Sequence, residues 1–333
     1  MARDLNAPLF TAVSSSARQL FLLLRCISFA SKAHVRVSPE NIRFSVEETS
    51  VLEAFVFLSK SIFTTYTYQD DTSEHDLPED APPPPTFQIS LPALLETLQI
   101  FTLGDLSKPS GDPYDTFAAH RLNRQANQPF SSTVLGTSGL CRLSYDGPGC
   151  PLSIHLSEAG VSTTCDLTTY EPESSSDIPF DRDAMALKTI MRATHLADAI
   201  AELASANPTT LTLLASPRAP FLSLSASGPL GSATVEFARD PQLLETFQCP
   251  QRFSQSYSFA LVKAAQRAMG SANKVSLRTD EQGVLSLQFL IEVETGQAGA
   301  GEGIGFVDFR IVPLVGDEND TEDGERADST DDD

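Results

Sequence analysis

Strict alternation of apolar and polar side chains marks two similar segments, one in each half of the chain. In the segment 274–291, apolar residues occupy every second position on both sides of a turn at 280–283. The segment 140–156 repeats this pattern around a turn at 146–149. Period-2 alternation on both sides of a glycine-containing turn predicts a β-hairpin. Two such hairpins in one chain predict a duplicated domain.

The remaining periodicities repeat one order of elements in both halves. Apolar residues at helical spacing predict two helices per half, at 17–28, 93–101, 194–203 and 261–269. Alternating or β-rich runs predict strands at 8–13, 34–37, 42–46, 51–65, 87–89, 161–167, 187–191, 211–214, 221–224, 234–237 and 305–313. This order predicts an α+β fold of duplicated domains, each with two helices packed on one face of an antiparallel sheet.

Polar and acidic segments set the expected domain limits. We expect a first domain at 8–169 with inserts at 70–85 and 104–127, a connector at 170–180, a second domain at 181–316, and an acidic tail at 317–333. The formal net charge is −21, and ten Asp or Glu against one Arg give the tail −9 of it. Residues 70–80 carry six further acids and no base, which leaves −6 for the rest of the chain. Acidic low-complexity runs are typical of disordered segments, so we expect a folded body that is only mildly acidic.

Cysteine usage and hydropathy indicate an intracellular chain. The five cysteines are scattered and show no C-x-x-C spacing, which argues against a disulfide scaffold or a zinc site: Cys26, Cys141, Cys150, Cys165 and Cys249. The apolar run at 20–24 is interrupted by Arg25 and is too short for a membrane span or a secretory signal. We expect a cytosolic or nuclear protein without membrane contact.

Several segments carry a family likeness. The last hairpin KVSLRTDEQGVLSLQFLI, the strand pair VRVSPENIRFSVEE and the passage SFALVKAAQRAMGSANKVSLRTD resemble the checkpoint sliding clamps. The likeness is to the Rad-one subunit of the heterotrimeric nine-one-one clamp, a relative of PCNA. It implies a ring formed with two paralogous clamp subunits, placed on double-stranded DNA by a checkpoint clamp loader. It also implies a nuclear platform for checkpoint and repair client proteins, with no cofactor and no reaction chemistry of its own.

Basic residues on or near the expected helices are candidates for DNA contact, because Lys and Arg neutralise phosphates without reading sequence. The alternative is that these bases only keep exposed helix faces soluble. The clamp resemblance favours DNA contact, and the candidate DNA-facing residues are Arg18, Arg25, Lys32, Lys188, Arg192, Lys263, Arg267 and Lys274.

Clamp subunits join by strand addition at sheet edges. The order of elements makes 161–167 and 231–237 the expected edge strands, with Val161, Thr163, Cys165, Leu167, Ser232, Thr234 and Glu236 as candidate interface residues. The connector at 170–180 either helps to bind client peptides or is a plain tether.

Two other functions compete with the heterotrimeric clamp. A 3′–5′ exonuclease needs carboxylates that hold two metal ions about 4 Å apart. Asp181 and Asp183 form a D-x-D, but it lies in a Pro-flanked linker, and the acids at 280–281 occupy a hairpin turn where acids are common. We therefore predict no catalytic and no metal-binding residues. A replication-type homotrimeric clamp is the third possibility.

Overall fold

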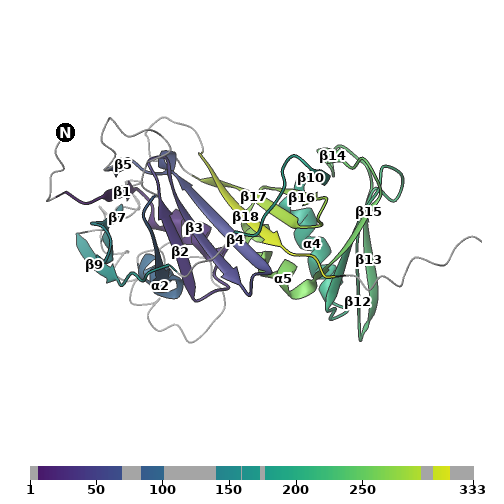
Figure 1. Cartoon of the computed structure of the whole chain (residues 1–333), viewed down its shortest axis with the longest axis horizontal. Coiled ribbons are helices and arrows are strands. Elements are labelled where there is room, and N and C mark those ends of the chain that lie inside the picture. The colour runs from purple at the N-terminus through teal and green to yellow at the C-terminus, as the bar shows by residue number, and fades with distance from the viewer. Residues whose placement is uncertain are drawn as a thin grey trace, which may run out of the picture.

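Three antiparallel sheets make up most of the computed structural model, which describes residues 7–69, 84–100, 140–158, 160–172, 177–293 and 303–315 (Figure 1). The expected inserts and acidic tail lie outside the described residues, apart from residues 84 and 85. The domain limits given above remain a prediction.

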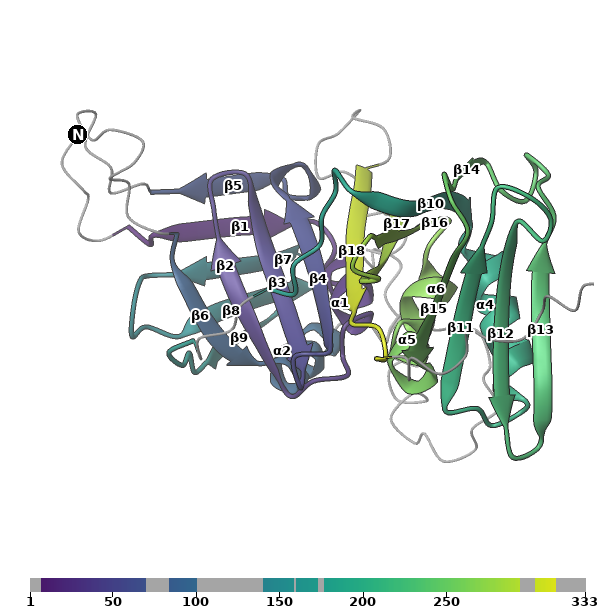
Figure 2. The same ribbon diagram turned by 45° about the vertical axis from the view of Figure 1, so that its right-hand side comes forward.

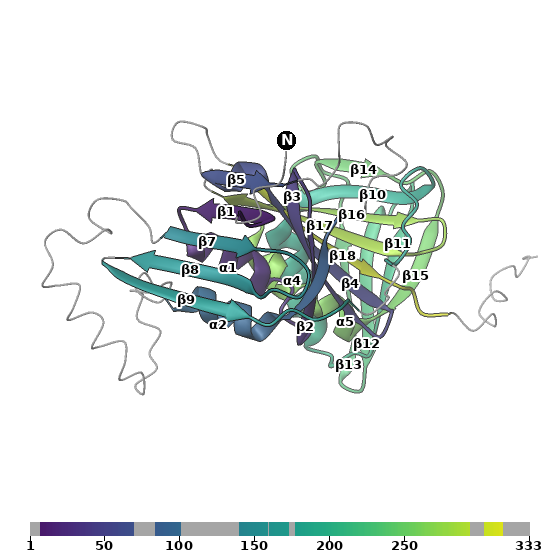
Figure 3. The same cartoon turned by 60° about the vertical axis from the view of Figure 1, so that its left-hand side comes forward.

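The first sheet has five strands and belongs to the N-terminal half. Its order is β5 (Thr65–Tyr68), β1 (Phe10–Ser14), β7 (Leu140–Tyr145), β8 (Leu152–Glu158) and β9 (Val161–Leu167). The hairpin expected at 140–156 is confirmed as β7 and β8, and β9 forms an edge of this sheet (Figure 3).

The second sheet has nine strands and runs through both halves. Its order is β14 (Thr246–Gln248), β10 (Met185–Arg192), β16 (Lys274–Asp280), β17 (Leu285–Val293), β18 (Gly303–Ile311), β4 (Leu52–Ser59), β3 (Asn41–Glu48), β2 (Lys32–Val37) and β6 (Thr86–Ser90). The hairpin expected at 274–291 is confirmed as β16 and β17. The strand expected at 305–313 is confirmed as β18, which pairs with β17 of the second half and also with β4 of the first half, so it joins the halves.

The third sheet has four strands and belongs to the C-terminal half (Figure 2). Its order is β13 (Gly231–Phe237), β12 (Leu222–Gly228), β11 (Thr210–Ala215) and β15 (Phe253–Ser258). The sequence patterns did not predict β14 or β15, because both lack clear alternation of apolar and polar residues.

Within the described residues, five α-helices lie against these sheets: α1 (Ala17–Arg25), α2 (Leu91–Gln99), α4 (Ala193–Ala204), α5 (Phe259–Ala264) and α6 (Gln266–Ser271). The Ser16 and Ser90 hydroxyls accept hydrogen bonds from backbone N–H groups in the first turns of α1 and α2. The sequence predicted one continuous helix at 261–269, and this prediction is wrong. The chain forms two short helices that meet at Ala265, whose ψ of 0° interrupts the helical hydrogen bonding.

The topology repeats, as the two hairpins predicted. The run β1-β7-β8-β9 has the same order of connections as β10-β16-β17-β18, and β4-β3-β2-β6 has the same order as β13-β12-β11-β15. In the intact chain β18 lies beside β4, whereas the corresponding strands β9 and β13 are both sheet edges within the described residues. The described part of the chain therefore contains one internal junction and two open edges that correspond to it.

The internal junction is tightly packed on its helix-facing side. Phe309 is fully buried, and its ring lies 5.8 Å from that of Phe289 and 6.2 Å from that of Phe29, which follows α1. Gly305 lies so close to α1 that an added Cβ would come within 2.8 Å of the Leu23 Cδ2 atom. The two halves are thus fixed to each other through both strands and side chains.

Candidate functional site

Four of the candidate DNA-facing bases lie on helices and are exposed: Arg18 and Arg25 on α1, Lys263 on α5 and Arg267 on α6. The five helices also carry three exposed acids, Glu96 on α2 and Asp198 and Glu202 on α4. Four bases against three acids leave the helices at +1. The positive charge of the helix layer is therefore small.

One of these arginines, Arg267, contacts the end of α1 where α1 approaches α6. The Arg267 guanidinium donates a hydrogen bond to the Ser28 hydroxyl, which in turn donates to the Arg25 carbonyl oxygen at 2.9 Å. Cys26 lies beneath them, and burial raises the pKa of its thiol to about 11, so it remains protonated at neutral pH. The contact fixes the Arg267 side chain beside the C-terminal end of α1, at the junction of the two halves.

The other four candidate bases lie on strands. Lys32 is the first residue of β2, and Arg192, the last residue of β10, lies directly opposite Lys274 of β16. The Lys274 ammonium forms an ion pair with Glu245 at 2.7 Å, which offsets its charge.

Lys188 faces away from the helices, so it does not share the face that is expected to meet DNA. Its neighbours Leu187 and Thr189 are buried on the core side of β10, and alternation turns Lys188 to the opposite face. There it lies across from Arg278 of β16. The sequence contained this signal, because Lys188 alternates with the apolar and buried positions of its strand.

Both expected edge strands are edges in the structure. On β9, Thr163, Cys165 and Leu167 are half-buried, whereas Val161 is 49% exposed. On β13, Ser232, Thr234 and Glu236 are exposed on the outer face. Within the described residues, no strand pairs with the outer side of either one. Their role as a subunit interface is a proposal, which is taken up below.

A polar cluster that the sequence patterns did not predict holds the connector on the outer face of the nine-stranded sheet. The Ile178 N–H donates to the Glu53 carboxylate at 2.8 Å, and the Arg310 guanidinium donates to the Ile178 carbonyl oxygen at 2.6 Å. Arg43 binds both oxygens of Asp177 at 2.8 Å. Burial, with a smaller contribution from the nearby Asp177 charge, raises the pKa of Glu53 to about 7.

An aromatic ring supports this cluster from below. Two guanidinium groups lie over the Phe55 ring, with the Arg43 Cζ at 4.2 Å and the Arg310 Cζ at 4.7 Å from its centroid. Cation–π contacts of this kind favour partly desolvated arginines. In the sequence, Arg43, Glu53 and Arg310 look like ordinary solvent-facing residues of alternating strands. Their contacts with the connector are seen only in the folded structure.

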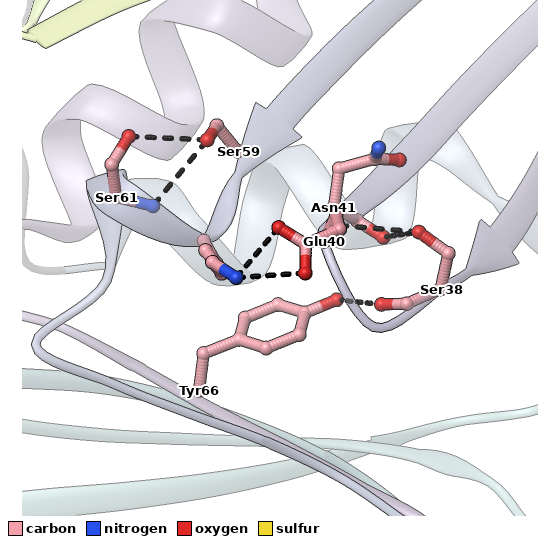
Figure 4. Close-up of polar contacts among 7 residues, drawn as sticks. Ser38, Glu40, Asn41, Ser59, Ser61 and Tyr66 are labelled. Carbon is pink, nitrogen blue, oxygen red and sulfur yellow. Dashed lines mark hydrogen bonds and ion pairs between the residues drawn. The ribbon is translucent and has the colours of Figure 1, made fainter. Parts of the chain in front are cut away.

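A hollow of about 490 Å³ lies at the other end of β4 and β18. Glu40, Asn41, Phe57, Ser59, Ser61, Ile304 and Phe306 line it. Figure 4 shows polar contacts next to Glu40, which pairs with Lys60, and the Tyr66 hydroxyl, which donates to the Ser38 carbonyl oxygen at 2.5 Å. Phe306 and Ile304 are 37% and 45% exposed, so the hollow has an apolar floor with a polar rim.

The D-x-D that could have served a nuclease has a conformational role. One oxygen of Asp181 accepts hydrogen bonds from the backbone N–H groups of Asp183 and Ala184, at 2.9 and 3.2 Å. Both carboxylates are exposed in a turn. Among the described residues, no group of three or more His, Cys, Asp or Glu could hold a metal ion, and no helix is long and apolar enough to cross a membrane.

The fold is that of the PCNA-like DNA clamps. A crystal structure of PCNA from Thermococcus kodakaraensis superposes with a TM-score of 0.61 at 16% identity, covering 92% of this chain and all of that one. A family model described as repair protein Rad1/Rec1/Rad17 matches residues 9–291. The chain therefore belongs to this family, which confirms the resemblance and the fold class expected from the sequence.

Named relatives agree with this membership. The DNA damage checkpoint control protein rad1 of Schizosaccharomyces pombe is 32% identical over 308 residues, which are 92% of this chain and 87% of the relative. The cell cycle checkpoint protein RAD1 of Homo sapiens is 30% identical over 298 residues, 90% of this chain and 89% of the relative. A relative named DNA repair exonuclease REC1, from Mycosarcoma maydis, is 29% identical over 203 residues, or 52% of this chain.

Proposed function

We propose that this chain is a non-catalytic subunit of a heterotrimeric DNA damage checkpoint clamp, which encircles double-stranded DNA in the nucleus. Two paralogous clamp subunits complete the ring, and a checkpoint clamp loader places it on DNA at damage sites. The closed ring then acts as a platform for checkpoint and repair proteins. The observation that carries this proposal is the repeated clamp topology, with one internal junction and two open edges.

The mechanism is topological. A closed ring stays on DNA because it cannot dissociate sideways, so tight contacts are unnecessary. The exposed helical bases Arg18, Arg25, Lys263 and Arg267 supply weak contacts with phosphates, which carry no sequence information. The five helices carry an excess of only one positive charge, so their contacts with DNA are weak enough for the ring to slide along it. Client proteins dock on the outer face, where the hollow lined by Phe57 and Phe306 offers an apolar site.

Co-expression with the two paralogous clamp subunits tests the DNA contact. The purified ring is titrated with duplex DNA at several salt concentrations, and binding is followed by fluorescence anisotropy. Each phosphate contact contributes about 0.9 to the slope of log K against log salt. Replacing Arg25 and Arg267 with Gln should make the slope shallower by about 1.8, whereas Lys188→Gln, on the opposite sheet face, should leave it unchanged. Equal slopes for all three rings would refute DNA contact by the helices.

The alternative is a 3′–5′ exonuclease, which the name of the Mycosarcoma maydis relative raises. The assay is release of nucleotides from a 3′-labelled duplex with Mg²⁺ or Mn²⁺ present. The non-catalytic proposal expects no release above that of the Asp181→Asn, Asp183→Asn double variant. Metal-dependent release that disappears in this variant would establish the enzyme instead.

A further inference from the structure

Glu53 is a buried acid on a sheet face that water would otherwise reach. Alternation places it on the outer face of β4, on the same side as Phe57, yet Glu53 is only 3% exposed. The connector covers it: the Ile178 N–H donates to the Glu53 carboxylate at 2.8 Å, and Ile178 itself is 6% exposed. A carboxylate that loses water in this way is costly unless a base neutralises it or it takes up a proton.

The bases around Glu53 make their short contacts with other groups. The Arg43 Nη2 atom lies 2.8 Å from both oxygens of Asp177 but 3.8 Å from the Glu53 Oε1 atom. The Arg310 guanidinium donates to the Ile178 carbonyl oxygen at 2.6 Å. Within the described residues, the one short hydrogen bond that the Glu53 carboxylate accepts comes from a backbone N–H. A proton can therefore supply the neutralisation that the arginines do not.

Each element packed against Glu53 brings charged or titratable groups to it. Glu47 lies directly opposite on β3, where like charges disfavour each other, and Arg310 lies directly opposite on β18. Asp308 is the next outward-facing residue along β18, and it binds the Ser286 hydroxyl. The remaining groups line a hollow of about 180 Å³ together with Glu53: His34 and Arg36 of β2, Arg43 of β3 and Asp177 of the connector.

We propose that the connector closes over the outer face of β4 with uptake of a proton by Glu53, so that it opens more readily as the pH rises through neutrality. An uncovered Glu53 would face water beside Arg43 and Arg310, which favours its ionised form, whereas burial under the connector favours the protonated form. The closed state holds a proton that the open state releases, so a rise in pH shifts the equilibrium toward the open state. The raised pKa of Glu53, about 7, agrees with this direction.

Opening of the connector also changes the apolar surface beside it. Phe55 is 0% exposed, and the guanidinium groups of Arg43 and Arg310 that lie over its ring are both bound to the connector. Its ring stacks against that of Phe57 with the centroids 6.1 Å apart, and Phe57 lines the 490 Å³ hollow. Release of the connector frees both guanidinium groups and so uncovers Phe55 next to this hollow. The device lies within one chain and does not depend on the proposed ring.

Amide hydrogen exchange of the full chain, followed residue by residue by NMR, measures how often the connector opens. The protection factor of the Ile178 N–H, corrected for the intrinsic pH dependence of exchange, should fall about tenfold between pH 6 and pH 8. In Glu53→Gln, whose side chain stays neutral, it should not change over this range. The internal control is the Val284 N–H, which donates to the Asp280 carboxylate at 2.9 Å outside the connector and should keep its protection.

Three outcomes would overturn the proposal. The first is an Ile178 protection factor that does not depend on pH in the wild-type chain, and the second is an equal fall in Glu53→Gln. The third is an equal fall at Val284, because exchange would then report global unfolding and not opening of the connector. A far-ultraviolet circular dichroism spectrum that matches the wild type confirms the fold of each variant.

Two further variants identify the titrating group, even if Glu53→Gln does not fold. His34→Gln removes the histidine of the same hollow and should keep the tenfold fall; loss of the fall would assign the proton to His34 and refute the role of Glu53. Asp177→Asn, at an exposed position, removes a nearby negative charge and frees Arg43 to pair with Glu53. The fall should then move to lower pH, and a fall at unchanged pH would contradict titration of Glu53.

Discussion

The side chain of Phe309 should contribute more to stability than any other at the junction of the two halves. Phe309 is 0% exposed and contacts one ring from each half, Phe29 and Phe289. Phe→Ala substitutions in protein cores cost about 3–5 kcal/mol, part of which is the cavity left behind. Each aromatic pair accounts for about 0.5–1.5 kcal/mol of this. Against a typical total of about 5–15 kcal/mol, Phe309→Ala should remove a large fraction of the free energy of unfolding.

Urea denaturation followed by far-ultraviolet circular dichroism measures this loss, since the chain has no Trp for fluorescence. Phe57→Ala is the matched control, because Phe57 lies in the same strand pair but on the outer face, half-buried beside the hollow. The control should cost about 1 kcal/mol. The reasoning is refuted if Phe309→Ala costs no more than Phe57→Ala, because the junction would then not depend on its helix-facing core.

Two further perturbations follow from the same sheet. Gly305→Val should lower the free energy of unfolding by about 1–3 kcal/mol, because the valine side chain enters the space of Leu23. Adding Leu23→Ala should recover part of this loss. Strictly additive losses in urea denaturation would contradict the contact. Burial raises the pKa of Glu53 from 4.5 to about 7, so the folded chain holds a proton that the unfolded chain releases, and this residue's contribution to stability falls as pH rises across that range. The Glu53→Gln variant should therefore gain stability relative to wild type between pH 5 and pH 8, and a relative loss would reverse the assigned direction.

The spacing of apolar and polar residues predicted the helices and strands that depend on neighbouring residues in the sequence. Both hairpins and the edge strand β9 follow from period-2 alternation, and α1 follows from apolar spacing after Ser16. The pairing of β18 with β4 joins residues about 250 positions apart. No periodicity reports such a contact.

Candidate-site residues were predictable to the extent that exposure follows from helix position. Arg18 and Arg25 are exposed on α1 as expected. Lys188 lies on a strand and points to the sheet face that is turned away from the helices. The cluster of Arg43, Glu53 and Arg310 was missed because its partner is the connector backbone. Sequence patterns describe side chains along one strand and contain no information about a distant segment that crosses it.

The covalent link between the halves has a consequence for how the proposed ring comes apart. Because β4 and β18 belong to one polypeptide, their junction forms at a high effective concentration that dilution cannot lower. The edges β9 and β13 have no such tether, so their occupancy falls with protein concentration. When the proposed ring opens to admit or release DNA, it should part between chains and never within one. Each chain would then leave as a rigid arc with its internal junction still closed.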